Sequence, residues 1–370
     1  MNMVSMIFTP QGAFYMINEL QKRNLASLLS REEMKDILCR QMYGYLPTVN
    51  FEMTVSEPTD VYGEYQLGTV VHSYVQMTIT VEGKSHSFRV DRLLHNDGMK
   101  RPTIILNNFH PIYASRYFAI EEMTEKDVNF IAVSYEDLTT DNDDFTTGLA
   151  PLLLPNGQNT DTACGKIGIW AWGNMRLVDY ALTLDCVDKD NICIAGHSRL
   201  GKTALYTGMQ DTRIKFVFSN ASGCCGDSLA KGNSGHESGE DKRMSGELYS
   251  DIYRVFPFWF CKSFEKHTKK NYCDDFDQHF LLASIAPRYV VLGACSHDFW
   301  ADPVSAQLSA LAASPAWESL GLAGYTAKEL LSVGQANDEG HIGFFLINSR
   351  HYLSRHSWNH FIDFIMKHKN

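Results

Sequence analysis

The stretch Ile194-Ala195-Gly196-His197-Ser198-Arg199-Leu200-Gly201-Lys202 decides the fold, because it joins an apolar run at 191–195 to a helical run at 202–209. A strand followed by a tight turn and a helix carries the Ser198 hydroxyl to the carboxyl edge of a sheet. It also directs the N–H groups of the helix start toward an oxyanion that develops there. The usual pattern places a second glycine two residues after the serine, whereas here it comes one residue later, at Gly201. By pattern alone, the turn therefore fits an ordinary helix N-cap equally well.

Short apolar runs alternate with helical segments on both sides of this turn. The predicted strands are 103–106, 129–133, 191–195, 216–219 and 289–293. Strands that are apolar almost throughout are typical of a parallel sheet covered by helices on both faces. We therefore predict an α/β fold of the α/β-hydrolase type, a three-layer α/β/α sandwich with a mostly parallel central sheet.

The N-terminal part of the chain follows a different pattern. Residues 1–65 form a partly helical lead-in, with helical spacing at 31–38. Residues 66–95 are rich in β-branched residues around a turn at 82–84, which predicts an antiparallel hairpin entering the sheet. A Gly- and Ser-rich segment, 222–246, predicts a long loop. We expect residues 1–370 to form a single catalytic domain.

Composition excludes several classes of partner. The 370 residues are 44% hydrophobic with a net charge of -10 and no long run of Lys or Arg, which argues against nucleic acid as a partner. No apolar stretch approaches the roughly 20 residues of a membrane span. Residues 1–20 lack the cationic start and cleavage site of a signal peptide, so the compartment stays open. The nine cysteines include no C-x-x-C pair, and we expect mostly reduced thiols, with one or two disulfides compatible with the count.

Residues 196–202 match, at every fixed position, the G-[CH]-S-R-x-G-K pattern of the glucuronoyl esterases, carbohydrate esterase family 15. The chain resembles the bacterial branch of that family from about residue 100 to its end. Further segments that carry the resemblance are 167–176, 219–226, 276–280, 285–288, 299–303 and 358–364. The resemblance implies a serine esterase of the α/β-hydrolase fold with Ser198 as its nucleophile.

Such an esterase needs a base and an acid, in the chain order serine, acid, histidine. The family places its base shortly before the helix that here spans 357–364, which indicates His351, with His341 as the runner-up. Fungal members carry a Glu where this chain has Ala221, so the acid must come from elsewhere. Asp298, at the end of the following strand, is the expected acid. Asp302 is the alternative, although an Asp before Pro is more typical of a turn.

The resemblance also implies residues on the substrate side. Arg199 would contribute to the oxyanion hole, since a fixed guanidinium beside the serine stabilises the tetrahedral intermediate. Lys202 lies one helical turn from Ser198 and would contact uronate hydroxyls. A second segment supplies the candidate sugar contacts Glu247, Arg254 and Trp259, to which Trp300 is added. For Trp259, core packing is an equally good interpretation.

The expected reaction is hydrolysis of esters of 4-O-methyl-glucuronic acid, such as lignin–xylan ester links or methyl glucuronate, through an acyl-enzyme and without a metal or organic cofactor. A carbohydrate acetyl esterase, for example acting on acetylxylan, is the alternative within the class. A catalytically silent carbohydrate-binding relative is the alternative of another class. The expected partner is glucuronoylated xylan or a lignin–carbohydrate ester, the expected oligomeric state is a monomer, and the resemblance suggests a secreted or periplasmic protein.

Overall fold

The structure is a computed structural model that describes residues 12–61, 70–112, 117–233 and 246–369. Residues 234–245 of the loop predicted at 222–246, and residues 66–69 at the start of the predicted hairpin segment, lie outside these residues. Within the described residues, one sheet of eleven strands runs in the order β1-β3-β4-β6-β5-β7-β8-β9-β11-β10, with β2 paired to β3. The strands are β1 (Glu52–Val55), β2 (Thr59–Asp60), β3 (Val70–Val81), β4 (Lys84–His95), β5 (Arg101–Asn108), β6 (Asn129–Ser134), β7 (Val187–His197), β8 (Phe216–Asn220), β9 (Tyr289–Cys295), β10 (Ala336–Asn337) and β11 (Ile342–Ile347).

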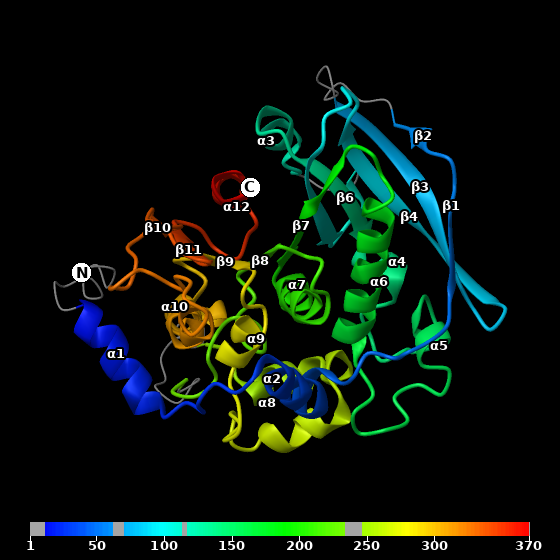
Figure 1. The fold of residues 1–370 in the computed structure, drawn as a ribbon. Helices are drawn as coiled ribbons and strands as arrows, with labels where there is room; N and C mark the ends of the chain where they lie inside the picture. The colour runs from blue at the N-terminus through cyan, green and yellow to red at the C-terminus, as the bar shows by residue number, and fades with distance from the viewer. Residues whose placement is uncertain (1–11, 62–69, 113–116, 234–245, 370) are drawn as a thin grey trace.

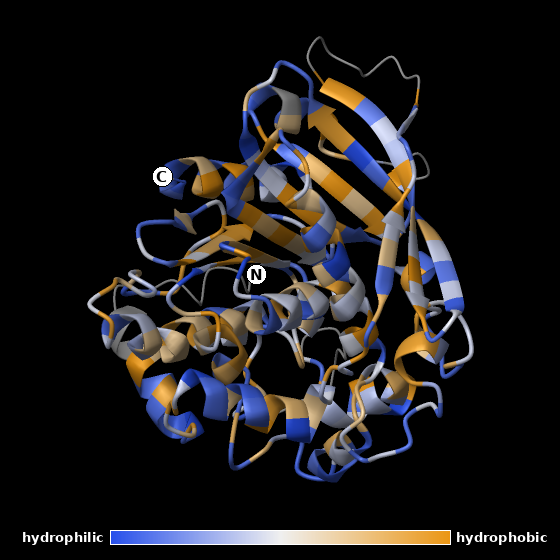
Figure 2. Cartoon of the chain, turned by 45° about the vertical axis from the view of Figure 1, so that its right-hand side comes forward, coloured by the Kyte–Doolittle hydropathy of each residue, from blue (hydrophilic) through white to orange (hydrophobic). Residues whose placement is uncertain are grey.

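Six neighbouring strands pair in parallel, in the order β6, β5, β7, β8, β9 and β11. Antiparallel strands flank them at both ends, β4 beside β6 and β10 beside β11. β3 and β4 form the hairpin around the turn at Glu82 and Gly83. Alternating residues of the hairpin point to opposite faces, whereas the central strands are apolar almost throughout (Figure 2). Every strand predicted from the sequence is present. β11 was not predicted from the sequence.

Helices cover both faces of the sheet (Figure 1). α3 and α12 pack on one face with the aromatic residues of β8, and α6, α7, α9 and α10 pack on the other. The helices are α1 (Gly12–Arg23), α2 (Arg31–Leu38), α3 (Ile120–Glu125), α4 (Tyr135–Leu138), α5 (Ala150–Leu153), α6 (Lys166–Ala181), α7 (Arg199–Gln210), α8 (Tyr249–Val255), α9 (His279–Ala283), α10 (Pro303–Ala313), α11 (Pro315–Glu318) and α12 (Arg355–His368). Three layers result, and the carboxyl ends of the parallel strands share one edge of the sheet.

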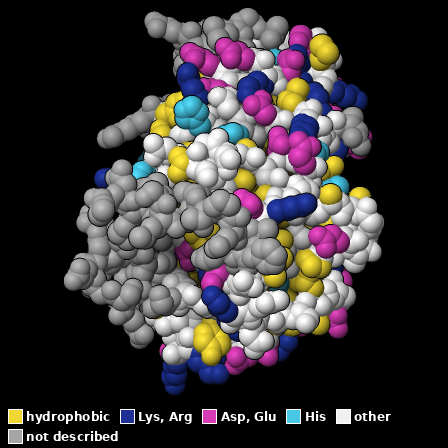
Figure 3. Space-filling model, turned by 90° about the vertical axis from the view of Figure 1, so that its left-hand side faces the viewer, with side chains coloured by type: hydrophobic (Ala, Val, Ile, Leu, Met, Phe, Trp, Pro, Cys, Tyr) yellow, Lys and Arg dark blue, Asp and Glu magenta, His cyan; other side chains and the backbone are white. Residues whose placement is uncertain are grey.

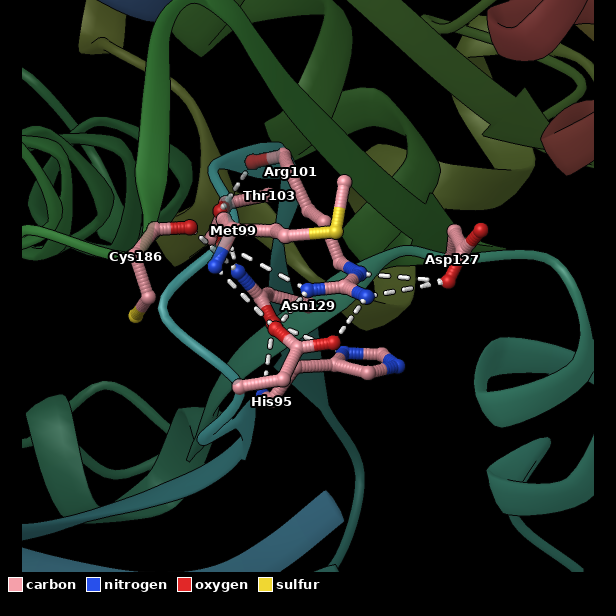
Figure 4. A network of polar contacts seen from close by, with 8 residues as sticks. His95, Met99, Arg101, Thr103, Asp127, Asn129 and Cys186 are labelled. Atoms are coloured by element: carbon pink, nitrogen blue, oxygen red, sulfur yellow. Dashed lines mark hydrogen bonds and ion pairs between the residues drawn. The ribbon is translucent and has the colours of Figure 1, made fainter. Parts of the chain in front are cut away.

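The opposite edge, where β5 and β6 begin, is closed by a polar network (Figure 4). Arg101 donates to both carboxylate oxygens of Asp97, at 2.6 and 2.7 Å, and also contacts Asp127 at 3.2 Å. The Asn129 side chain accepts from the His95 backbone N–H at 3.0 Å and donates to the Cys186 carbonyl at 3.0 Å. The network therefore ties the ends of neighbouring elements together at this edge.

The surface carries charges of both signs. On the face drawn in Figure 3, Lys and Arg side chains are interspersed with Asp and Glu side chains. All nine cysteines are free thiols. Within the described residues, no helix has the length and apolar character that crossing a membrane requires.

Candidate active site

Ser198 lies in the turn between β7 and α7 with φ 57° and ψ -126°, a strained conformation for a residue that has a side chain. Its backbone N–H donates to the Asn220 carbonyl at 2.9 Å, which ties the turn to the end of β8. A Cβ at Gly196 would lie 2.0 Å from the Leu200 carbonyl oxygen, so only glycine fits there. A Cβ at Gly201 would meet β8 and the loop after it at 3.0–3.1 Å, so the close approach of α7 to β8 favours a glycine at this position.

A histidine and a carboxylate meet at the same edge of the sheet. Asp298 follows β9, and His351 follows β11, the parallel neighbour of β9. His351 Nδ1 lies 2.5 Å from Asp298 Oδ2, and the Asp298 side chain is 7% exposed. Because Nδ1 is engaged by the carboxylate, Nε2 is the ring nitrogen left to exchange a proton with a hydroxyl.

The runner-up residues lie elsewhere. Asp302 is the N-cap of α10, where its Oδ1 accepts from the Ser305 N–H at 3.0 Å. His341 immediately precedes β11, at the amino edge of the sheet, and its ring stacks on Tyr289 with the centroids 4.5 Å apart. β11 begins at the residue after His341. The geometry therefore favours Asp298 and His351 over both alternatives.

A second histidine packs against His351. The ring centroids of His197 and His351 are 4.5 Å apart, which places His351 beside the turn that holds Ser198. Asn220 Nδ2 lies 2.9 Å from His197 Nδ1 and 3.2 Å from the Tyr352 carbonyl oxygen, so it links the nucleophile strand to the histidine loop. Burial, with the charge of His351 as a smaller cause, lowers the pKa of His197 to about 3. His197 is therefore neutral at ordinary pH.

The Arg199 guanidinium lies over the rings of Trp259, Phe256 and Phe109, at 4.7, 5.0 and 5.8 Å from their centroids. Its Nη1 forms an ion pair with Asp141, a residue that the sequence analysis did not identify. Asp141 lies in the loop after α4, more than fifty residues before the nucleophile. Its one signal in the sequence is a run of acidic and polar residues at 139–144, which is also typical of an exposed loop.

Three of the predicted sugar contacts gather on the other side of the nucleophile. Lys202 is 4% exposed and donates to the Ser222 carbonyl at 2.5 Å. Burial raises the pKa of the Glu247 carboxyl, and the charge of Lys202 and a hydrogen bond from Trp300 oppose that shift. The Trp300 side chain is 38% exposed, so its ring is open to a ligand. Cation, carboxyl and aromatic ring are the groups that recognise a uronic acid.

The two remaining predicted contacts differ. Trp259 is 3% exposed and stacks on Phe256 with the centroids 3.9 Å apart, so it supports Arg199 from within the protein. Arg254 is exposed near the end of α8 and forms no hydrogen bond or ion pair with the rest of the described chain. The geometry does not bring Arg254 together with the other candidates.

The residue that follows β8 is Ala221, which has no carboxylate. Ala221 has φ 49° and lines a small cavity together with Asp227 and Asp298. Asp227 is turned away into hydrogen bonds with Ser219 Oγ at 3.1 Å and the Gly223 N–H at 2.8 Å. Asp298 is therefore the carboxylate that the structure brings to His351. Among the described residues, no three His, Cys, Asp or Glu side chains are arranged to hold a metal ion.

A mostly parallel sheet, a strained serine between strand and helix, and a carboxylate–histidine pair at the ends of the later strands define an α/β hydrolase. Solved structures agree on the fold. The glucuronoyl esterase from Solibacter usitatus superposes with a TM-score of 0.81, at 22% identity, over 92% of each chain. A promiscuous CE15 esterase from a marine bacterial metagenome superposes with a TM-score of 0.79, at 24% identity, over 91% of each chain. The predicted fold class is confirmed.

A family model described as glucuronyl esterase, fungi, matches residues 77–321. The chain belongs to the glucuronoyl esterase family, carbohydrate esterase family 15, as the resemblance indicated. It is 34% identical over 204 residues to carbohydrate esterase MZ0003 from an unknown prokaryotic organism, covering 55% of this chain and 44% of that relative. It is 27% identical over 195 residues to 4-O-methyl-glucuronoyl methylesterase 1 of Wolfiporia cocos, covering 51% and 46%. The matches thus span less than half of the length of these two relatives.

Proposed function

We propose that this chain is a serine-type carboxylic ester hydrolase that cleaves esters of 4-O-methyl-glucuronic acid. The observation that carries the proposal is the hydrogen bond of 2.5 Å between His351 Nδ1 and Asp298 Oδ2, beside the strained turn of Ser198. The substrate class is supported by family membership and by the Wolfiporia cocos relative, which is named a 4-O-methyl-glucuronoyl methylesterase. The natural substrate would be glucuronoylated xylan or a lignin–carbohydrate ester.

In the proposed acylation step, Ser198 Oγ attacks the ester carbonyl carbon while His351 Nε2 accepts the hydroxyl proton. Asp298 holds the ring through Nδ1 and stabilises the imidazolium that forms. The carbonyl electron pair moves to oxygen and gives a tetrahedral oxyanion. When the oxyanion collapses, the C–O bond to the alcohol breaks, and His351 gives its proton to the departing alcohol.

The oxyanion would be held by backbone N–H groups at the start of α7 and by the Arg199 guanidinium. In deacylation, His351 takes a proton from water as the water attacks the acyl-enzyme carbonyl. Collapse of the second oxyanion breaks the bond to Ser198 Oγ, which recovers its proton from His351. Deacylation consumes one water molecule, and its products are the free uronic acid and the enzyme in its starting state.

Lys202, Glu247 and Trp300 would bind the sugar. The Lys202 amine and Glu247 carboxyl supply a donor and an acceptor for ring hydroxyls, and the exposed Trp300 ring supplies an apolar face. We propose that Trp259 acts indirectly through Arg199, and that Arg254 contacts only the more distant parts of a long glycan. Residues 1–370 are taken as one catalytic domain that works as a monomer, secreted or periplasmic.

The test compares two ester substrates under identical conditions. The protein is incubated with the methyl ester of 4-O-methyl-glucuronic acid and with acetylated xylan, and released methanol and acetate are measured. We expect a higher kcat/KM for the uronate ester. Release of acetate alone would assign a carbohydrate acetyl esterase instead. If neither product forms, the chain is a catalytically silent relative, and binding of glucuronoxylan would then be measured by calorimetry.

A further inference from the structure

The surroundings of Arg199 require an anion. Its side chain is 25% exposed and lies against three aromatic rings, a setting with little water to solvate a positive charge. Cation–π contacts compensate for part of this loss of hydration. They leave the direction of the guanidinium free, however, because a ring face attracts a cation without selecting one N–H. A hydrogen-bond acceptor in a fixed position is needed to orient the Arg199 guanidinium.

Asp141 is that partner, and it is itself held in place. One carboxylate oxygen, Oδ2, pairs with Arg199 Nη1 and accepts from the Tyr135 hydroxyl at 3.1 Å. The other oxygen, Oδ1, accepts from Trp259 Nε1 at 2.6 Å. The Asp141 side chain is 7% exposed. Since both oxygens have donors from separate elements, the carboxylate can occupy only one position.

A buried lysine holds the loop that carries Asp141. Lys166, at the start of α6, is fully buried and donates to Thr139 Oγ1 at 2.8 Å and to the Asp144 carbonyl at 2.6 Å. Trp170 Nε1 also donates to the Thr139 carbonyl, at 3.2 Å. These contacts bracket Asp141 on both sides along the chain. The position of the carboxylate therefore does not depend on Arg199.

The guanidinium keeps donors for a ligand. Asp141 occupies Nη1, whereas Nη2 and the buried Nε of Arg199 have no hydrogen-bond partner among the described residues. An unpartnered buried N–H is unfavourable unless a ligand supplies the acceptor. The residue is also the direct neighbour of Ser198 in the chain. The Arg199 guanidinium is thus held by Asp141 at Nη1, while its other nitrogens keep N–H groups without an acceptor.

We propose that Asp141 is the positioning residue of the oxyanion site: it anchors Arg199 through Nη1 and thereby aims the remaining N–H groups of the guanidinium at the oxyanion. This inference rests on the proposed esterase function, because it assigns Asp141 a role only through Arg199. Asp141 touches no reacting atom. Its removal leaves Arg199 attracted by three rings but not directed, so binding of the substrate survives while stabilisation of the transition state is lost.

The test is a double-mutant cycle between Asp141→Asn and Arg199→Ala, with Asp143→Asn as the matched control. Asp143 is exposed, lies on the same loop and changes the net charge equally. Removing one oxyanion donor typically lowers kcat by about 10²–10³-fold. We expect Asp141→Asn to lower kcat by about 10–100-fold with KM changed by less than about 3-fold, because only part of that stabilisation depends on aim. Asp143→Asn should leave kcat unchanged.

In the Arg199→Ala background, we expect Asp141→Asn to have almost no further effect on kcat. Equal losses in both backgrounds would overturn the proposal, because they would show a role that does not pass through Arg199. The proposal also fails if Arg199→Ala leaves kcat unchanged. Tyr135→Phe provides a milder second variant in case Asp141→Asn folds poorly, since it removes one hydrogen bond to Asp141 and keeps the carboxylate. Its smaller loss of kcat should also vanish in the Arg199→Ala background.

The cycle is measured with both the methyl uronate and p-nitrophenyl acetate. An oxyanion forms during hydrolysis of either ester, so the coupling between Asp141 and Arg199 is expected with both. If the uronate ester is not cleaved but the aryl acetate is, the proposed substrate fails while the coupling is still measured. Coupling that is absent with both esters overturns the positioning role alone.

Discussion

The two edges of the central sheet each carry an arginine that pairs with carboxylates, and the two arginines are used in opposite ways. At the amino edge, Arg101 contacts two carboxylates, Asp97 and Asp127 (Figure 4). At the carboxyl edge, Arg199 has one carboxylate, Asp141, and a buried Nε without a partner among the described residues. Ion pairing is therefore common to both edges. The difference is that every nitrogen of the Arg101 guanidinium has a partner, whereas Arg199 keeps a donor without one.

The residues beside the two arginines differ between the edges in the same way. The amino edge is held by Asn129, whose amide is saturated by neighbouring backbone groups. The carboxyl edge holds Ser198 in a strained turn and leaves the His351 side chain 44% exposed. Strain and open hydrogen-bonding positions persist in a fold only where the surrounding structure imposes them, and they concentrate at functional sites. We infer that the amino edge serves stability and the carboxyl edge serves chemistry.

The largest effect that would break this comparison concerns Ser198. We expect Ser198→Ala to lower kcat on the methyl uronate by on the order of 10⁴–10⁶-fold, because no other group supplies the nucleophile. The melting temperature should change little, since alanine and serine are equally strained at φ 57°. Steady-state kinetics and thermal unfolding of the same preparation check both statements. Substantial remaining activity would move the nucleophile away from the carboxyl edge.

Asp298→Asn is expected to have the next largest effect, a loss of kcat of about 10³–10⁴-fold. The amide can donate to His351 Nδ1 and so favour the wrong tautomer, in which Nε2 carries the proton and cannot accept one from Ser198. Asp302→Asn is the matched control, because the asparagine oxygen can still cap α10, so that both stability and kcat should stay close to those of the wild type. If Asp302→Asn lowered kcat and Asp298→Asn did not, Asp302 would be the acid.

How much of this site was predictable depends on how local each signal is. The strands predicted from apolar runs are all present, and Gly196 with Ser198 marked the turn, because its geometry is imposed by neighbours in sequence. β11 was not predicted, although 342–347 is apolar apart from Gly343. In the structure, that glycine makes room for Phe364, which a Cβ would approach to 2.8 Å.

Asp141 could not be predicted from the sequence at all. Its role depends on Trp259 and Arg199, which lie 118 and 58 residues away along the chain. Nothing in the acidic stretch around it distinguishes a buried anchor from a solvated loop carboxylate. Asp298 could be predicted because it follows the apolar run at 289–293, and the ends of parallel strands meet at one edge of the sheet. His351 was predicted from the family resemblance, since β11, the strand before it, was not predicted.

A smaller effect tests the amino edge. We expect Arg101→Met to lower the melting temperature by a few degrees, because it leaves Asp97 and Asp127 facing each other without a cation. kcat and KM should remain those of the wild type at temperatures well below unfolding. Lys126→Met, which removes the more exposed ion pair with Asp363, serves as the control and should be nearly neutral. A change in kcat for Arg101→Met would show that the two edges are coupled and would end the division of roles.

The last expected effect lies at the boundary of the site and appears only in acid. Burial lowers the pKa of His197 to about 3, whereas an unfolded histidine titrates near 6.5. Between about pH 6.5 and pH 3, the unfolded chain therefore binds a proton that the folded chain does not, so the free energy of unfolding falls as the pH decreases through this window. His197→Gln should make the decline of the melting temperature between pH 7 and pH 4 less steep, whereas His356→Gln, at an exposed position on α12, should leave it unchanged. An equal slope in all three proteins would mean that His197 is hydrated in the native state. The contact between the His197 and His351 rings would then hold the His351 ring in place less firmly than the distance of 4.5 Å between their centroids indicates.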